Sequence, residues 1–199
     1  MKLRTLAWSA VLGTAAAAVG HAAIRTHGCA EADRELFRTL NRGHGPEADR
    51  FFFGVTELGS LYAACAAAAA LAVVGPRRAA LRALGAAGAT WLLGQAVKKA
   101  VDRPRPYEED PGGTRSMIAE PMGTSWPSNH PAVLTTFTRV AARELGLGAA
   151  TRAALTGLDL SVAASRVYLG VHYPSDVASG LLMGRAVARL WPGRSRAGR

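Results

Sequence analysis

The chain has 199 residues, a formal net charge of +10 and a hydrophobic content of 49%. This length is typical of a single domain. Lys and Arg are spread along the chain and form no basic stripe interleaved with aromatic residues, so we expect no nucleic-acid partner. Ala and Gly supply much of the apolar content, and such small residues are common where transmembrane helices pack closely.

Apolar segments recur along the sequence, and six can be marked. They cover residues 5–24, 58–74, 79–101, 131–147, 149–164 and 177–191. The first three are long enough, or nearly so, to cross a hydrocarbon core of about 30 Å. The last three contain charged side chains, which must snorkel, pair or face the bundle interior, and Asp159 is expected to face inward. We predict an all-α fold, a six-helix transmembrane bundle.

Domain organisation and orientation follow from the same pattern. We predict one membrane-embedded domain over residues 1–192 and a disordered basic tail over residues 193–199. A cytoplasmic N-terminus would place many loop arginines inside, as the positive-inside rule predicts, and most acidic residues outside, although five arginines between residues 25 and 50 would also lie outside. The segment 5–24 fits either an anchor or a cleaved signal peptide. Residues 31–53 fit a helix that lies in the membrane interface or packs on the surface.

A first polar cluster follows the third apolar segment. Lys98 lies near the expected end of that helix, which Pro104 should terminate, and Arg105 follows. An ammonium group and a guanidinium group at this spacing can bind one anion together. Cations are also favoured at any helix C-terminus, so this cluster alone is weak evidence for a site.

Two further clusters precede the fourth and sixth apolar segments. In the second, Ser128 or Asn129 can cap a helix whose free amides would bind a phosphate, and His130 can donate a proton. In the third, which should join the fifth and sixth helices, Asp176 can accept a hydrogen bond from one ring nitrogen of His172. The other ring nitrogen would then keep a free lone pair that can attack phosphorus.

Together the three clusters resemble the type 2 phosphatidic acid phosphatases, a membrane family related to class A acid phosphatases and vanadium haloperoxidases. The family pattern is Lys, six residues, Arg-Pro; then Pro-Ser-Gly-His; then Ser-Arg, five residues, His, three residues, Asp. The matching residues are Lys98, Arg105, Pro106, Pro127, Ser128, His130, Ser165, Arg166, His172 and Asp176. Asn129 stands where the family usually has Gly, which puts the rate and the backbone contact to phosphate in question.

The resemblance implies a helical bundle whose site lies at the outer membrane surface, and a role for each matching residue. His172 would attack phosphorus and form a phosphohistidine, Asp176 would orient it, and His130 would protonate the leaving alkoxide and then activate water. The residues implied to hold the phosphoryl oxygens are Lys98, Arg105, Ser128, Asn129 and Arg166. Such a cationic site needs no metal, so we expect no cofactor, and residues 108–110 are expected to form a solvated acidic loop.

The expected partners are a lipid phosphate substrate and membrane lipids, and the expected location is the cell membrane, with the site on the extracytoplasmic face. Candidate substrates are phosphatidic acid, phosphatidylglycerol phosphate, polyprenyl pyrophosphate and a polyprenyl phosphosugar. Three alternatives remain open: a secreted soluble acid phosphatase, a vanadium haloperoxidase, and a non-enzymatic membrane protein that binds anions or lipids. Neither the substrate nor the oligomeric state follows from the sequence.

Overall fold

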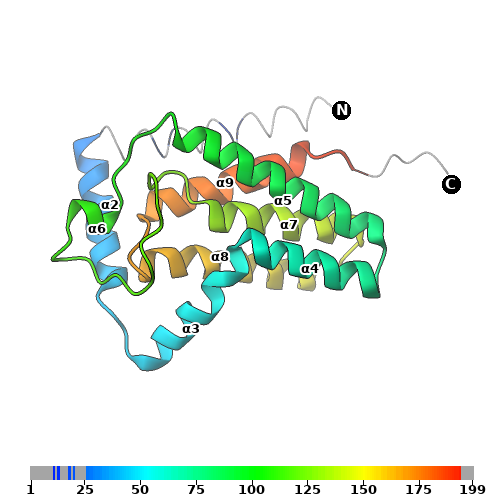
Figure 1. Ribbon diagram of the computed structural model, residues 1–199, viewed down its shortest axis with the longest axis horizontal. Coiled ribbons are helices and arrows are strands. Elements are labelled where there is room, and N and C mark those ends of the chain that lie inside the picture. The colour runs from blue at the N-terminus through cyan, green and yellow to red at the C-terminus, as the bar shows by residue number, and fades with distance from the viewer. Residues whose placement is uncertain (1–10, 12, 14–17, 19, 21–25, 194–199) are drawn as a thin grey trace.

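The protein is all-helical in the part that its computed structural model describes, which comprises residues 11, 13, 18, 20 and 26–193. Five helices run side by side along the long axis of the molecule (Figure 1). They are α4 (Leu61–Val74), α5 (Arg77–Lys98), α7 (Asn129–Glu144), α8 (Ala149–Tyr168) and α9 (Pro174–Leu190). The anchor or signal peptide predicted over residues 5–24 lies largely outside the described residues, and so does the tail predicted over residues 193–199 apart from residue 193.

The remaining elements gather at one end of this bundle (Figure 1). They are α2 (His27–Asn41), α3 (Pro46–Thr56), a 3₁₀ turn (Glu57–Gly59) and α6 (Pro106–Glu109). The interface or surface helix expected over residues 31–53 is therefore two helices, because Gly43, Gly45 and Pro46 interrupt the helical pattern. Phe51 and Phe53 on α3 are more than half exposed.

The predicted helix boundaries are close to the observed ones at most ends. Ser60 begins α4, because its Oγ accepts a hydrogen bond from the amide of Ala63 at 3.0 Å. The helix α5 ends at Lys98, well before the proline expected to stop it. The largest difference is in α8, which continues to Tyr168. Ser165 and Arg166, expected in the connection between two helices, therefore belong to the last turn of α8.

The helix α7 forms the centre of the bundle and packs against α5, α8 and α9. Its side chains from Pro131 to Thr138 are all buried, which explains why this segment has no polar face. Polar contacts also fix the helix spacing. The Thr136 hydroxyl lies 2.9 Å from the Thr90 hydroxyl of α5 and donates to the Gly184 carbonyl of α9 at 3.1 Å. The middle of α7 is thereby held next to α5 and α9.

Three charged side chains inside the bundle have polar partners. Glu144 of α7 is buried and lies 3.1 Å from the Arg82 guanidinium of α5. Asp159 is 1% exposed, which confirms that it faces inward, and it accepts a hydrogen bond from the Thr138 hydroxyl at 3.1 Å. Arg143 donates to the carbonyl oxygen of Ala188 at 2.8 Å. These contacts offset the cost of burying charge among apolar helices.

Within residues 26–193, no single helix combines the length and the apolar character needed to cross a bilayer. Residues 46–59 and 61–74 meet that requirement together, but with a bend of 71° between them.

Candidate active site

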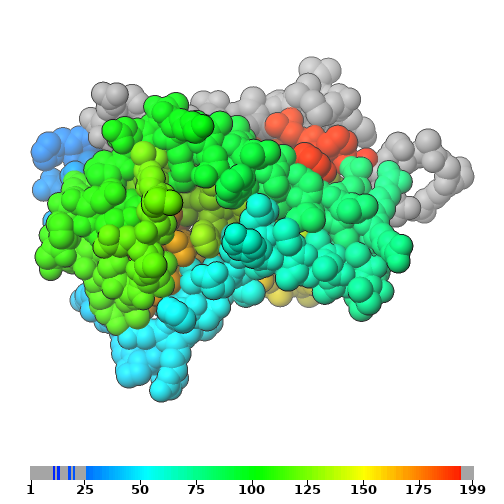
Figure 2. All heavy atoms as spheres, viewed as in Figure 1, coloured from blue at the N-terminus to red at the C-terminus, as the bar shows by residue number. Residues whose placement is uncertain are grey.

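The three polar clusters of the sequence meet around one cavity of about 510 Å³. Figure 2 shows the molecule hollowed between the green loop that precedes α7 and the cyan start of α4. Six residues expected in the site line this cavity: Lys98, Arg105, Asn129, His130, Arg166 and His172. Its remaining wall is largely apolar and includes Leu61, Tyr62, Cys65, Trp91, Met122 and Val133. The cavity is thus cationic at its base and apolar toward α4 and α5.

His172 is 3% exposed and lies in the turn between α8 and α9. Its backbone amide donates to the carbonyl oxygen of Arg166 at 3.2 Å, which folds the turn back onto the end of α8. Gly170 adopts a φ of +84°, and a side chain there would collide with the backbone of Arg115. The close packing of this turn therefore fixes where the imidazole points.

The two ring nitrogens of His172 face different partners. Nδ1 lies 3.5 Å from Oδ2 of Asp176 and 3.4 Å from Oγ of Ser125. Nε2 lies 3.4 Å from an Arg105 nitrogen at the cavity. An arginine donates hydrogen bonds and cannot accept one, so Nε2 must present its lone pair on this side. The proton of the neutral ring then lies on Nδ1, facing the carboxylate.

The charge states of this pair suit that arrangement. Burial, followed by the nearby Arg105 charge, lowers the pKa of His172 to about 3, although Asp176 opposes the shift. Burial alone would raise the pKa of Asp176, but the contacts with His172 and Arg103 outweigh it and lower the pKa to about 2. Near neutral pH the free protein therefore holds a neutral imidazole beside an ionised carboxylate.

Three cations surround the cavity, and each is held by backbone or hydroxyl oxygens. Arg105 donates to the carbonyl oxygens of Gly123 at 2.7 Å and Val171 at 2.9 Å. Lys98 donates to the carbonyl oxygens of Thr124 and Ser125. Arg166 is 3% exposed, its NH1 donates to the Thr56 hydroxyl at 2.8 Å, and its buried Nε has no hydrogen-bond partner. Within the part of the chain that the structure describes, these side chains form no ion pair at the cavity, so an anion bound there would neutralise an existing positive charge.

The second cluster is only partly assembled around the cavity. His130 and Asn129 line it, at the point where α7 begins. Ser128 is fully buried and does not line it, and its hydroxyl has no hydrogen-bond partner and does not cap α7. The Asn129 side chain donates to Gln95 at 3.2 Å and lies so close to Gly94 that a Cβ there would collide with it. The Asn in place of Gly is therefore accommodated by a glycine on the neighbouring helix.

The sequence analysis assigned no role to several buried residues near Asp176. Arg103 donates to Asp176 Oδ1 at 2.6 Å, and Ser125 donates to Asp176 Oδ2 at 2.5 Å. Asp33 of α2 accepts from Arg103 at 2.7 Å. The Arg-Pro-Arg-Pro sequence, in which Arg103 precedes the motif arginine, could have drawn attention to it. Asp33 lies 70 residues earlier and carries no local signal.

The acidic residues 108–110 are exposed, as expected of a solvated segment, but Glu108 and Glu109 belong to a short helix and not to a loop. They lie in and beside α6, and the Glu108 carboxylate accepts a hydrogen bond from the backbone amide of Arg105 at 2.6 Å. Glu109 accepts from Arg34 at 2.7 Å and from the Tyr173 hydroxyl at 2.6 Å. Glu109 has these partners because α2 and the turn that contains His172 both approach α6. Among the described residues, His, Cys, Asp and Glu form no group of three suited to a metal ion.

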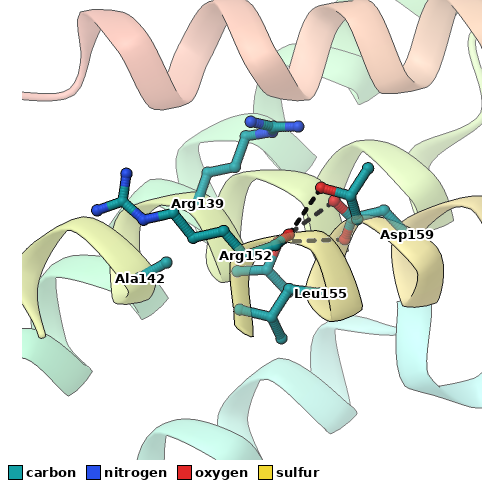
Figure 3. Close-up of a pocket in the computed structure, with 7 residues that line it drawn as sticks. Arg139, Ala142, Arg152, Leu155 and Asp159 are labelled. Carbon is teal, nitrogen blue, oxygen red and sulfur yellow. Dashed lines mark hydrogen bonds between the residues drawn. The ribbon is translucent and has the colours of Figure 1, made fainter. Parts of the chain in front are cut away.

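A second cavity, of about 100 Å³, lies between α7 and α8 farther along the bundle (Figure 3). Thr138 and Asp159 are hydrogen-bonded in its wall. The guanidinium group of Arg152 points away from Asp159, and those of Arg139 and Arg152 point in different directions (Figure 3). They do not converge on a common point, so this cavity does not share the chemistry of the larger one.

Comparison with known proteins agrees with this geometry. The model of a family described as the PAP2 superfamily matches residues 79–196. The chain belongs to the PAP2 superfamily. This confirms the resemblance drawn from the three motifs, and the matched region contains every motif residue.

Solved structures of this superfamily share the fold. LpxE of Aquifex aeolicus matches with a TM-score of 0.69 and 26% identity, over 78% of this chain and 92% of that one. The transmembrane PAP2-type phosphatidylglycerolphosphate phosphatase of Bacillus subtilis matches with a TM-score of 0.70 and 22% identity, over 94% of this chain and 92% of that one. The predicted all-α fold of the phosphatase family is confirmed.

The curated relatives are decaprenylphosphoryl-5-phosphoribose phosphatases from two strains of Mycobacterium tuberculosis. They are 37% identical to this chain over 100 residues, which make up 47% of this chain and 49% of each relative. The chain therefore matches about half the length of these relatives. Both relatives are phosphatases, in agreement with the class of enzyme that the motifs predicted.

Proposed function

We propose that this protein is a lipid phosphate phosphatase that hydrolyses a phosphomonoester or a pyrophosphate on a lipid through a phosphohistidine. One observation carries the proposal. A buried neutral imidazole, His172, keeps one nitrogen toward an ionised Asp176 and the other toward a cavity lined by Lys98, Arg105 and Arg166. This combination of a nucleophile, an orienting carboxylate and an anion site is what phosphoryl transfer requires.

In the first step, the Nε2 lone pair of His172 forms a bond to phosphorus as the bond between phosphorus and the lipid oxygen breaks. His130, which must enter this step protonated, donates a proton to that oxygen, and the lipid leaves as an alcohol. Asp176 stabilises the positive charge that develops on the His172 imidazole, as the aspartate does in a Ser-His-Asp triad. In the second step the now neutral His130 takes a proton from water, and the water oxygen forms a bond to phosphorus as the bond between phosphorus and Nε2 breaks. Phosphate, free His172 and protonated His130 result.

Charge neutralisation in this reaction is assigned to protein cations. Lys98, Arg105 and Arg166 would hold the phosphoryl oxygens, and the unpaired Nε of Arg166 supports this role. Asn129 would add a contact from the N-terminus of α7, where the first amides of a helix have no partner within the helix. Ser128 would contribute its unpaired hydroxyl, which requires a small rearrangement because it does not reach the cavity wall.

The substrate class follows from the other half of the cavity. Leu61, Trp91 and Met122 give it an apolar wall suited to a lipid tail next to the phosphate. We place the protein in the cell membrane, since its structural relatives include a transmembrane phosphatase. The charge pattern of the loops favours the extracytoplasmic side for this cavity. The Mycobacterium tuberculosis relatives favour a polyprenyl phosphosugar over phosphatidate, phosphatidylglycerol phosphate and polyprenyl pyrophosphate as the first substrate to test.

The test is phosphate release by the purified full-length protein in detergent, with EDTA present, from each of these four lipids. The wild type should hydrolyse at least one of them, and His172→Ala should reduce the rate to background. His27→Ala, which removes a fully exposed histidine of α2, is the matched control and should keep the wild-type rate. Undiminished release by the His172→Ala protein would refute the nucleophile, and no release from any lipid by the wild type would refute the function.

A further inference from the structure

The side chain of Arg103 joins two buried carboxylates. Its NH1 donates to Asp176 at 2.6 Å, and its NH2 donates to Asp33 at 2.7 Å. The three side chains are each less than a tenth exposed. We propose that Arg103, anchored by Asp33 of α2, is a positioning residue that keeps Asp176 ionised and aimed at His172. The inference rests on the function proposed above, because it assigns a role in the same reaction.

The geometry fixes both oxygens of Asp176. Oδ1 accepts from Arg103, while Oδ2 accepts from the Ser125 hydroxyl at 2.5 Å and the Tyr173 amide at 2.8 Å. The same Oδ2 is the oxygen that faces Nδ1 of His172. Because Arg103 occupies the other oxygen, the carboxylate cannot rotate without breaking a charge-assisted hydrogen bond. Arg103 therefore acts on the imidazole through Asp176, without touching the cavity.

Arg103 is itself held on three sides. Its guanidinium lies 4.2 Å from the centre of the Tyr173 ring, and its NH1 also donates to the Ser175 hydroxyl at 2.7 Å. Asp33 completes the arrangement, since it accepts from the Ser175 amide at 2.9 Å as well as from Arg103. The planar guanidinium group of an arginine can bridge two carboxylates in this way, whereas a lysine side chain offers a single nitrogen. The helix α2 is thereby tied to the first turn of α9, directly beside the nucleophile.

Arg103 is the cation in direct contact with Asp176. The other charged or titratable groups that act on Asp176 are His172 beside it and, at longer range, Lys98 from the end of α5 and Arg105 from the loop before α6. An opposite charge in contact lowers the pKa of an aspartate by about one to three units. Without Arg103, Asp176 would be protonated at a higher pH. A protonated Asp176 no longer stabilises the imidazolium, so activity would be lost earlier as the pH falls.

The first experiment compares the pH dependence of kcat for the wild type and Arg103→Met, on the lipid phosphate that the wild type hydrolyses best. Ionisation of the substrate affects both pH curves equally, so a difference between their midpoints reports ionisation of groups in the protein. We expect kcat near neutral pH to fall about 10- to 100-fold, as for other residues that orient a catalytic group. The acid-side midpoint should move upward by about one to three pH units. In Arg103→Lys the acid-side midpoint should return most of the way to the wild-type value, because the lysine restores the positive charge.

The matched control is Arg34→Met, which removes an arginine of α2 that pairs with Glu109 and does not contact Asp176. Its acid-side midpoint should equal that of the wild type. A second variant, Asp33→Asn, separates the position of Arg103 from its charge. It loosens Arg103 but leaves its charge beside Asp176, so kcat should fall while the midpoint does not move upward. Substitution of a residue needed only for folding would lower kcat by the same factor at every pH and would leave the acid-side midpoint unchanged.

An unchanged midpoint in folded Arg103→Met would overturn the inference, and so would an upward shift of equal size in Arg34→Met. A readout that needs no turnover separates this failure from failure of the proposed function. The ring nitrogens of ¹⁵N-labelled His172, followed by NMR during a pH titration in detergent, should show a weaker Nδ1 hydrogen bond in Arg103→Met. Identical His172 spectra in the two proteins would also overturn it, whatever the substrate. Failure of the wild type to hydrolyse any lipid phosphate would refute the function alone.

Discussion

Asn129 is the residue at which the second motif departs from the family pattern, and its surroundings have adapted to it. Its side chain occupies space that a larger residue at position 94 would fill, and it donates to Gln95 of the same helix. Both contacts come from α5, the helix that ends at Lys98. The identity of residue 129 is therefore coupled to the packing of α5 against the start of α7.

This coupling predicts that Gly94→Ala lowers activity and that Asn129→Gly restores it. The added Cβ would force Asn129 out of its place, with an overpacking cost of about 1–3 kcal/mol, whereas a glycine at 129 leaves room for it. The measurement is kcat/KM and thermal stability for both single variants and the double variant. Gly88→Ala is the control, because a Cβ at that position of α5 meets open space. Additive effects of the two substitutions would contradict the coupling.

At the scale of the helices, α5 and α7 are joined by polar contacts in the middle of the pair and at one end. The hydroxyls of Thr90 and Thr136 meet in the middle of the pair, and Arg82 reaches Glu144 at the end away from the site. The Glu144 side chain is 3% exposed and that of Arg82 is 21% exposed. Removing one partner of such a pair leaves the other charge buried without compensation.

Glu144→Gln should therefore destabilise the protein by about 3–5 kcal/mol, because the Arg82 charge loses its partner. Replacing both residues together, as Arg82→Met with Glu144→Leu, should return most of that stability. The measurement is the thermal unfolding midpoint in detergent, and Arg78→Met, at an exposed position of α5, serves as the control. If the double variant is no more stable than Glu144→Gln, the pair does not act as a unit.

At the scale of the whole molecule, the sequence predicts the elements of the fold better than their mutual arrangement. The apolar segments give α4, α5, α7, α8 and α9, because each of them is a long and largely apolar run of residues. The site residues Lys98, Arg105, His130 and His172 were recognisable because their spacing within each motif is local in sequence.

Other features depend on contacts between distant segments, and no local pattern encodes them. Arg103 and Asp33 pair only because α2 folds against the start of α9, so neither was predicted. Ser128 was expected to contact phosphate, but its distance from the cavity is decided by how α7 packs. The helical extent of α8 through Arg166 was also missed, since polar residues there suggested a loop.

The membrane location belongs to this scale, and it predicts a simple result. After alkaline carbonate washing of membranes from cells expressing the full chain, the protein should remain with the membranes, because a multi-pass bundle is not released by charge or pH. A peripheral membrane protein expressed in the same cells provides the control and should be released. Recovery of the chain in the soluble wash would favour a secreted soluble phosphatase.

The central claim is that His172 carries the phosphoryl group during turnover. The most direct test mixes the purified protein with a ³²P-labelled lipid phosphate, quenches within milliseconds in alkali, which preserves phosphohistidine, and locates the label by peptide mapping. The account predicts label on the peptide that contains His172, and none in His172→Ala. Label on a different residue, or turnover without a labelled protein at any quench time, would contradict it.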